Sequence, residues 1–241
     1  MKKKKKYIDG IFNYCDSWCE RCQFTSRCRN FAMQQKMIAD EEQRDKANEE
    51  FWKAMKAATG DAMEELSQKA AEIEDPEPEA MWNDDDDDHE RMSHAEAGRH
   101  RLGTLSWRYS EHVRRYLSQY KNFSALPCEA VEIVAWYHLF IHVKLCRALM
   151  SRHHEKQDEE NYGDEDSEES WPKDSDGSAK IAIIGMERSI SGWMIIGDQF
   201  PEWSDEAKRN VKMLIKLRAY TDRDFPEARR FRRPGFDDVG E

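Results

Sequence analysis

The chain has 241 residues, with 38 Lys and Arg against 49 Asp and Glu, a formal net charge of −11. This charge repels a phosphate backbone over most of the surface, so we expect no nucleic-acid partner and predict no nucleic-acid-binding residues. No stretch of about 20 residues is apolar and free of charge, and Lys2 to Lys6 are not followed by the apolar segment of a signal peptide. We therefore expect a cytoplasmic protein without a membrane partner.

Four of the six cysteines lie in the first 32 residues. Cys15, Cys19, Cys22 and Cys28 are separated by three, two and five residues. In a reducing cytosol, clustered cysteines are metal ligands or catalytic groups more often than disulfides. Free thiols at this density risk oxidation, whereas a bound metal holds them as thiolates. The sequence therefore predicts a metal-binding module over residues 1–32 with these four cysteines as ligands.

Two metal groups fit four thiolates. Zn²⁺ closes a tetrahedral four-cysteine site and supplies folding free energy, but zinc sites commonly pair two short knuckles on separate segments. Here all four cysteines lie on one continuous segment. An iron-sulfur cubane is larger than a single zinc ion, so one short cysteine-rich segment can wrap around it. We predict a 4Fe-4S cluster, with Zn²⁺ as the alternative.

The run Cys19-Glu-Arg-Cys22-Gln-Phe-Thr-Ser-Arg-Cys28 resembles the C-x2-C-x5-C cluster segment of RecB-like iron-sulfur exonucleases and is similar to the SPASM segments of radical-SAM maturases. The resemblance implies that Cys19, Cys22 and Cys28 bind a 4Fe-4S cluster, with Cys15 as the fourth ligand. The spacing of Cys15, Cys19 and Cys22 also matches the radical-SAM cysteine triad. The catalytic parts of these families have no counterpart in the chain, so the resemblance implies a cluster and no activity.

The remaining sequence predicts helices separated by acidic segments. Apolar residues recur at helical spacings in five segments, which are 33–74, 102–120, 130–150, 179–200 and 204–217. Of these, 130–150 is apolar nearly all round and is expected to be central and buried. Runs of like charge predict solvated linkers. In chain order we expect a helical segment 33–74, an acidic linker 75–93, a helical bundle domain 94–225 with an acidic loop 156–177, and a basic, irregular tail 226–241.

Helix boundaries within the bundle domain follow from caps and prolines. Ser178 is the expected N-cap of the helix that Pro201 ends, and Ser204 that of the last helix. No strand alternation is sustained, so the predicted fold class is all-α, a bundle of about four to five helices with an N-terminal four-cysteine module. The stretch 177–238 also resembles that of uncharacterised bacterial helical proteins, which implies a helical fold and no activity.

A second candidate metal site lies on the apolar helix. His138 and His142 are one helical turn apart, and Glu187 on another apolar helix is the nearest candidate for a third ligand. The alternative is that hydrogen bonds satisfy both histidines inside the core, as is usual for buried polar groups.

No Gly-rich phosphate loop, nucleophile elbow or zincin helix is present, so the sequence gives no support for a hydrolase or a kinase, and enzyme chemistry at a second site in the bundle stays open. We predict a metal-binding protein whose 4Fe-4S cluster senses redox state or oxygen, or carries electrons to a protein partner that the sequence does not identify. The alternative is an interaction or adaptor protein without catalytic activity, in which Zn²⁺ is a structural staple.

Overall fold

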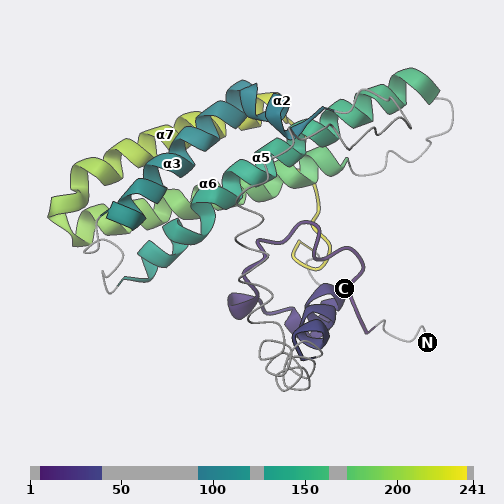
Figure 1. Ribbon diagram of the computed structural model, residues 1–241, viewed down its shortest axis with the longest axis horizontal. Coiled ribbons are helices and arrows are strands. Elements are labelled where there is room, and N and C mark those ends of the chain that lie inside the picture. The colour runs from purple at the N-terminus through teal and green to yellow at the C-terminus, as the bar shows by residue number, and fades with distance from the viewer. Residues whose placement is uncertain (1–5, 40–91, 120–127, 163–172, 238–241) are drawn as a thin grey trace, which may run out of the picture. The chain divides into compact units, whose positions relative to one another are not determined.

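The computed structural model describes residues 6–39, 92–119, 128–162 and 173–237 (Figure 1). These residues form two units. The N-terminal unit contains 6–8 and 19–39, and the helical unit contains 9–18 and everything described from residue 92 onward. The helices of the second unit are α2 (His94–Arg99), α3 (Arg101–Gln119), α5 (Glu129–Tyr162), α6 (Asp174–Gln199) and α7 (Ser204–Asp224). The described residues contain no strand, which confirms the predicted all-α class.

The helical unit is an antiparallel four-helix bundle. α5 packs along α6, α6 along α7, α7 along α3 and α3 along α5, as Figure 1 shows. Ion pairs fix the directions: Arg101 at the start of α3 meets Asp224 at the end of α7 at 3.2 Å, and Arg147 of α5 meets Asp174 at the start of α6 at 3.3 Å. Short α2 precedes α3 and begins with a capping box formed by Ser93 and Glu96.

Large aromatic and aliphatic side chains from all four long helices fill the core. Trp193 of α6 is fully buried, and its indole N–H donates a hydrogen bond to the hydroxyl of Tyr109 on α3 at 3.1 Å. Burial raises the pKa of Tyr109 to about 12, so the hydroxyl remains neutral. Other large, fully buried side chains of the bundle are Leu102, Tyr137, Ile141, Leu145, Leu149, Ile181, Met186, Ile196, Leu214 and Leu217.

Helix α5 is longer and less completely buried than predicted. It continues to Tyr162 through the first part of the expected acidic loop 156–177, because Glu, Lys and Gln are good helix formers. Lys173 also bridges to Glu159 at 2.7 Å and ties this last part of α5 to the start of α6. Leu139 and Val143 are 46% and 52% exposed, so one face of α5 lies at the surface.

Helix α6 begins earlier than predicted. Asp174 is its first residue and Lys173 its N-cap, so the prediction of Ser178 as the N-cap was wrong and Ser178 is buried within the helix. Glu155 of α5 accepts hydrogen bonds from the backbone N–H (2.9 Å) and hydroxyl (2.6 Å) of Ser175. A carboxylate from another helix thus accepts a hydrogen bond from an N–H group in the first turn of α6. A side-chain cap on the same helix would otherwise satisfy this group.

The boundary between α6 and α7 and the segment after α7 agree with the predictions only in part. α6 ends at Gln199 before Pro201 as predicted, but a 3-10 turn at Pro201–Trp203 leads into α7 and makes Ser204 its first helical residue. After α7 the chain is irregular, as expected for 226–241, yet its described part to residue 237 packs on the bundle. Phe225, Ala228 and Phe231 are all buried there.

Several predicted segments lie largely outside the described residues. Residues 33–39 are helical, as expected for the segment 33–74, but the remainder of that segment is not described. The acidic linker 75–93, apart from its last two residues, also lies outside, as do 163–172 of the acidic loop and the last four residues.

By length and composition alone, α5 would be able to cross a membrane, over Glu129–Glu160. Core helices of soluble proteins meet the same two criteria, and α5 packs along both α3 and α6. The observation is therefore weak evidence for a membrane span.

Candidate metal centre

Three of the four predicted ligands lie in the N-terminal unit, on a series of tight turns. Cys19 begins a 3-10 turn at Cys19–Arg21, a second follows at Thr25–Arg27, and Cys28 leads into the helical residues 29–39. All six cysteines of the chain are free thiols, and the four of the cluster segment are partly exposed. The turns thus leave the thiols of Cys19, Cys22 and Cys28 partly exposed and not enclosed in a core.

Backbone N–H groups point at two of these sulfurs. The N–H of Phe24 donates to Cys22 Sγ at 3.4 Å, and the N–H of Phe31 donates to Cys28 Sγ at 3.5 Å. Hydrogen bonds of this kind stabilise negative charge on sulfur and tune the potential of a cluster bound to it. Cys22 and Cys28 therefore have surroundings suited to thiolates.

Cys15 lies in the helical unit, on a segment that we call the strap (residues 9–18). Its thiol donates a hydrogen bond to the carbonyl oxygen of Phe12 at 3.4 Å. Nearby, Lys144 donates to the carbonyl of Asn13 at 3.4 Å; burial lowers the pKa of its ammonium and Arg147 lowers it further, whereas negative charge on Cys15 opposes the shift. Lys144 therefore places a partly buried cation near Cys15.

The residues on both sides of Cys15 anchor the strap to the bundle. The Asp16 carboxylate accepts from the hydroxyl of Tyr137 at 2.7 Å and pairs with Arg188, and its carbonyl accepts from the indole of Trp136 at 2.9 Å. Trp18 stacks on Trp136 with ring centroids 4.9 Å apart. This single residue, Asp16, thus contacts both α5 and α6.

On the other side of Cys15, the Tyr14 hydroxyl donates to Asp174 at 2.9 Å, and its ring packs edge-on against Phe231. Burial and the Asp174 carboxylate raise the pKa of Tyr14 to about 12, so it remains a donor. Gly177 provides the space for both rings. A Cβ at that position would lie 2.4 Å from Tyr14 and 2.7 Å from Phe231.

We expect Gly177→Ala to lower the free energy of unfolding by about 1–3 kcal/mol, the usual cost of overpacking a filled site. Gly98→Ala is the matched control, because no atom lies within 4 Å of a Cβ there and alanine favours the helix. Urea unfolding followed by circular dichroism measures both. Equal stability of the two variants would contradict the described packing of Tyr14 against α6.

The described residues contain no group of three or more His, Cys, Asp or Glu side chains arranged to hold a metal ion. The chain thus presents thiols with suitable donors, while the four-thiol arrangement itself stays a prediction. Thiolate sites commonly assemble together with their metal, so the type and number of ligands decide which metal group a chain fits. Four free thiols fit either an iron-sulfur cluster or Zn²⁺.

The second predicted site is not brought together among the described residues. His138 Nδ1 lies 2.6 Å from the carbonyl oxygen of Ala135, and His142 Nδ1 lies 3.0 Å from Ser106 Oγ. Burial lowers the pKa of both histidines. Glu187 instead pairs with Arg229 at 3.1 Å and Arg218 at 3.6 Å. The contacts of the two histidines are those of the alternative, satisfied core residues.

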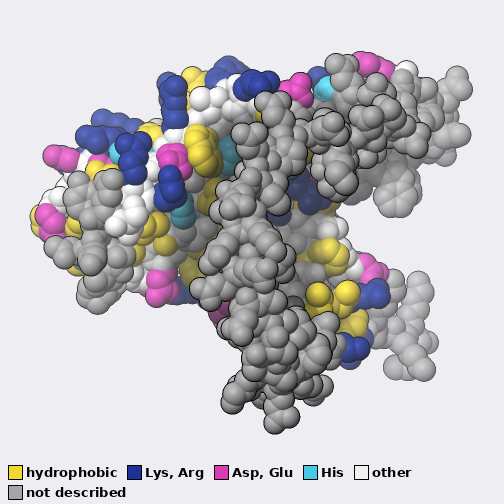
Figure 2. All heavy atoms as spheres, in the orientation of Figure 1, with side chains coloured by type: hydrophobic (Ala, Val, Ile, Leu, Met, Phe, Trp, Pro, Cys, Tyr) yellow, Lys and Arg dark blue, Asp and Glu magenta, His cyan; other side chains and the backbone are white. Residues whose placement is uncertain are grey.

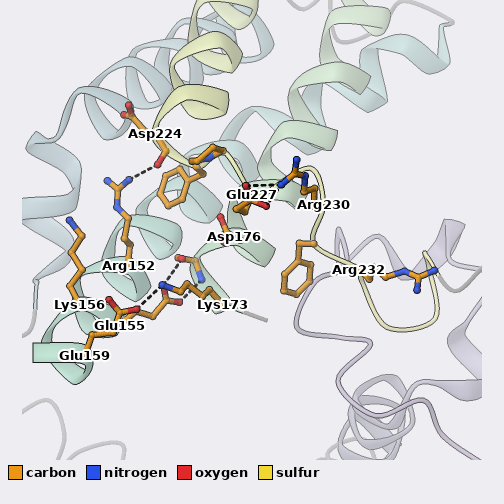
Figure 3. Close-up of a pocket in the computed structure, with 14 residues that line it drawn as sticks. Arg152, Glu155, Lys156, Glu159, Lys173, Asp176, Asp224, Glu227, Arg230 and Arg232 are labelled. Carbon is orange, nitrogen blue, oxygen red and sulfur yellow. Dashed lines mark hydrogen bonds and ion pairs between the residues drawn. The ribbon is translucent and has the colours of Figure 1, made fainter. Parts of the chain in front are cut away.

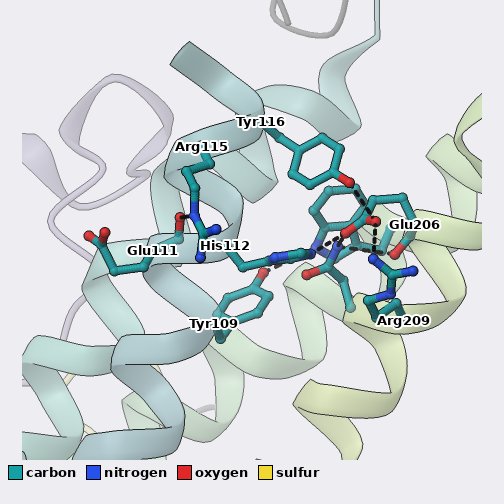
Figure 4. Close-up of polar contacts among 9 residues, drawn as sticks. Tyr109, Glu111, His112, Arg115, Tyr116, Glu206 and Arg209 are labelled. Atoms are coloured by element: carbon teal, nitrogen blue, oxygen red, sulfur yellow. Dashed lines mark hydrogen bonds and ion pairs between the residues drawn. The ribbon is translucent and has the colours of Figure 1, made fainter. Parts of the chain in front are cut away.

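Sequence reasoning missed a polar network between α3 and α7 (Figure 4). The Glu206 carboxylate, 8% exposed, contacts His112 Nε2 and accepts from Tyr116 (2.6 Å), Asn210 (2.9 Å) and Arg209 (3.2 Å). Four donors saturate a carboxylate. The i, i+4 spacing of His112 and Tyr116 was the available local signal, but the pairing with Glu206 depends on two helices far apart in sequence.

A pocket of about 570 Å³ lies where α5, the start of α6 and the segment after α7 meet (Figure 3). Most of its charged groups pair with one another or with the backbone: Arg152 donates to the carbonyl of Asp224 at 2.7 Å, and Arg230 pairs with Glu227 at 2.9 Å. Asp176 also lines the pocket, and burial, with Glu155 adding, raises its pKa. These paired charges hold the C-terminal segment against the bundle. They do not indicate a particular ligand for the pocket.

Comparison with known proteins provides no family assignment. No protein-family model matches the chain, and neither curated proteins nor solved structures gave a match.

Proposed function

We propose that the chain is a metal-binding protein in which Cys15, Cys19, Cys22 and Cys28 hold a 4Fe-4S cluster. The observation that carries the proposal is four free thiols within fourteen residues, two of which accept backbone N–H bonds. Cys15 precedes Cys19 by only four residues, a distance that the chain spans in at most about 14 Å. The covalent connection therefore permits all four sulfurs to ligate one cluster.

The bound cluster would supply one-electron chemistry, and the protein would set its potential and access. The N–H donors at Cys22 and Cys28 stabilise the more negative, reduced form. Phe24 and Phe31, which provide these N–H groups, are half-buried aromatic residues beside the sulfurs. An accessible cluster of this kind suits redox or oxygen sensing, or electron transfer to a protein partner, and no enzymatic activity is proposed.

Zn²⁺ remains the second candidate because four thiolates also satisfy its tetrahedral preference. In that case the site is a structural staple, and the helical unit presents the binding face of an adaptor. The two functions differ in a measurable way: a cluster changes its absorption reversibly with reductant, whereas Zn²⁺ is colourless and has no redox chemistry.

The test is anaerobic purification of the full chain, followed by visible spectroscopy with cycles of dithionite and a mild oxidant. We expect a broad brown absorption that bleaches on reduction and returns on oxidation. Cys19→Ser, Cys22→Ser and Cys28→Ser should each lose it, and Cys15→Ser should do the same. Cys128→Ser is the control, because Cys128 lies at the start of α5 and hydrogen bonds to Gln199.

A colourless protein with one Zn²⁺ per chain would replace the cluster by the staple. Retention of metal in all four cluster-segment variants would contradict both functions. Loss in Cys128→Ser alone would assign the metal to the helical unit instead.

A further inference from the structure

The negative charge of the chain is unevenly distributed. The acidic run Asp84 to Asp88 and much of the remaining acidic excess belong to residues 40–91 and 163–172, whereas the described residues contain more Lys and Arg than Asp and Glu. Figure 2 shows Lys and Arg side chains gathered over α3 and α7. The repulsion expected from the net charge therefore does not apply to this face.

Six cations form two rows on this face. On α3 they recur every seven residues, which is about two turns and 10.5 Å along the helix, and on α7 they have the same spacing. We call the two rows together the cationic seam: Arg101, Arg108 and Arg115 on α3, and Arg209, Lys216 and Arg223 on α7.

The rows lie beside each other because the helices are antiparallel neighbours. At one end, Arg101 and Arg223 both contact Asp224 and both lie over the ring of Tyr220. Toward the other end, Arg209 pairs with Glu206, which also contacts His112 on α3. The seam thus runs along much of the α3–α7 contact.

The acidic partners lie beneath the cations. The side chain of Arg209 is 62% exposed above Glu206, which is 8% exposed, and that of Arg223 is 59% exposed above Asp224 at 15%. The carboxylates therefore orient the guanidinium groups and leave part of each toward solvent. Arg108 is exposed and has no ion-pair or hydrogen-bond partner among the described residues.

An exposed aromatic residue flanks the α3 row of the seam. Trp107, whose ring lies 5.1 Å from that of His142 on α5, is 47% exposed beside Arg108. With Arg115, His112, Glu111 and Met213 these two line a shallow hollow of about 480 Å³. Its one carboxylate, Glu111, is held by Arg114 in a two-point contact at 2.8 and 2.9 Å. The hollow therefore combines an exposed indole with two guanidinium groups, of which Arg115 donates to the carbonyl of Glu111 at 3.4 Å and Arg108 has no ion pair among the described residues.

We propose that the cationic seam binds single-stranded nucleic acid. Guanidinium groups at Arg108 and Arg115 hold phosphates by paired N–H donors, and the Trp107 indole stacks on a base in the hollow between them. An acidic polypeptide would also be attracted by the charge, but it would make no use of an exposed aromatic platform. For this face the proposal differs from the expectation that net charge gives for the whole chain.

The test is fluorescence anisotropy of a labelled oligothymidylate of about 20 nucleotides with the full chain, at two salt concentrations. We expect saturable binding that weakens with salt. Arg108→Gln with Arg115→Gln should raise Kd at least about tenfold and flatten the salt dependence, and Trp107→Ala should raise Kd about tenfold. The matched control is Arg230→Gln with Arg232→Gln, which removes equal charge from exposed positions outside the seam.

Circular dichroism verifies that each variant is folded. The proposal is overturned if the oligonucleotide does not bind at low salt, or if the control pair loses as much affinity as the seam pair. Equal or tighter binding of polyglutamate, sensitive to the same seam variants but not to Trp107→Ala, would also overturn it and assign the seam to an acidic polypeptide.

Discussion

Trp193→Ala is expected to lower the free energy of unfolding of the helical unit by about 3–5 kcal/mol, the usual range for removing a buried large aromatic side chain. Trp193 is 0% exposed at the centre of the bundle. Its removal leaves a cavity between α6 and α3 and also deprives the buried Tyr109 hydroxyl of its donor at 3.1 Å.

Urea unfolding of the unmodified chain and of Trp193→Ala measures the difference in their free energies of unfolding. Trp107→Ala is the control, because that indole is 47% exposed on α3 and its loss should change stability by well under about 1 kcal/mol. The same variant thus separates stability from the binding proposed for the cationic seam. Similar losses in both variants would contradict the described core.

Glu206→Ala should cost about 3 kcal/mol, at the low end of the range for breaking a buried charged contact. The carboxylate is 8% exposed and contacts four donors, of which Tyr116 and Asn210 are held near it by the surrounding helices. Arg209 reaches solvent and is rehydrated when its partner is removed, which limits the loss.

Two further variants make this test specific. Glu206→Gln keeps the size and one acceptor, so we expect an intermediate loss of stability. Glu202→Ala removes an exposed acid from the turn before α7 and should be close to neutral. If Glu206→Ala were as stable as Glu202→Ala by chemical denaturation, the network would contribute nothing to the α3–α7 contact.

Local sequence patterns predicted helix type well and helix ends less well. The amphipathic stripe that begins at Leu102 became α3, and the apolar stretch 130–150 became the first part of α5. Acidic composition was misleading at the end of α5, because residues such as Glu155 and Glu159 are good helix formers that also find partners on Ser175 and Lys173. Those partners come from the next helix, so the local pattern does not contain them.

The strap and the Glu206 network were not predictable from local patterns. Asp16 lies 172 residues from Arg188 in the chain, and His112 lies 94 residues from Glu206. Each pairing requires the bundle topology to be known first. The four cysteines are different, because their spacing along one short segment already contains the chemical signal. The four candidate ligands could therefore be proposed from the sequence, whereas the anchoring of Cys15 by Tyr14 and Asp16 could not be predicted.

The measurement that tests the central claim most directly is iron, zinc and acid-labile sulfide analysis of the full chain purified without oxygen. The proposed cluster predicts about four iron and four sulfide per chain. About one zinc without sulfide would contradict the cluster and leave the cysteines as a structural staple. No stoichiometric metal of either kind would contradict a metal centre at Cys15, Cys19, Cys22 and Cys28 altogether.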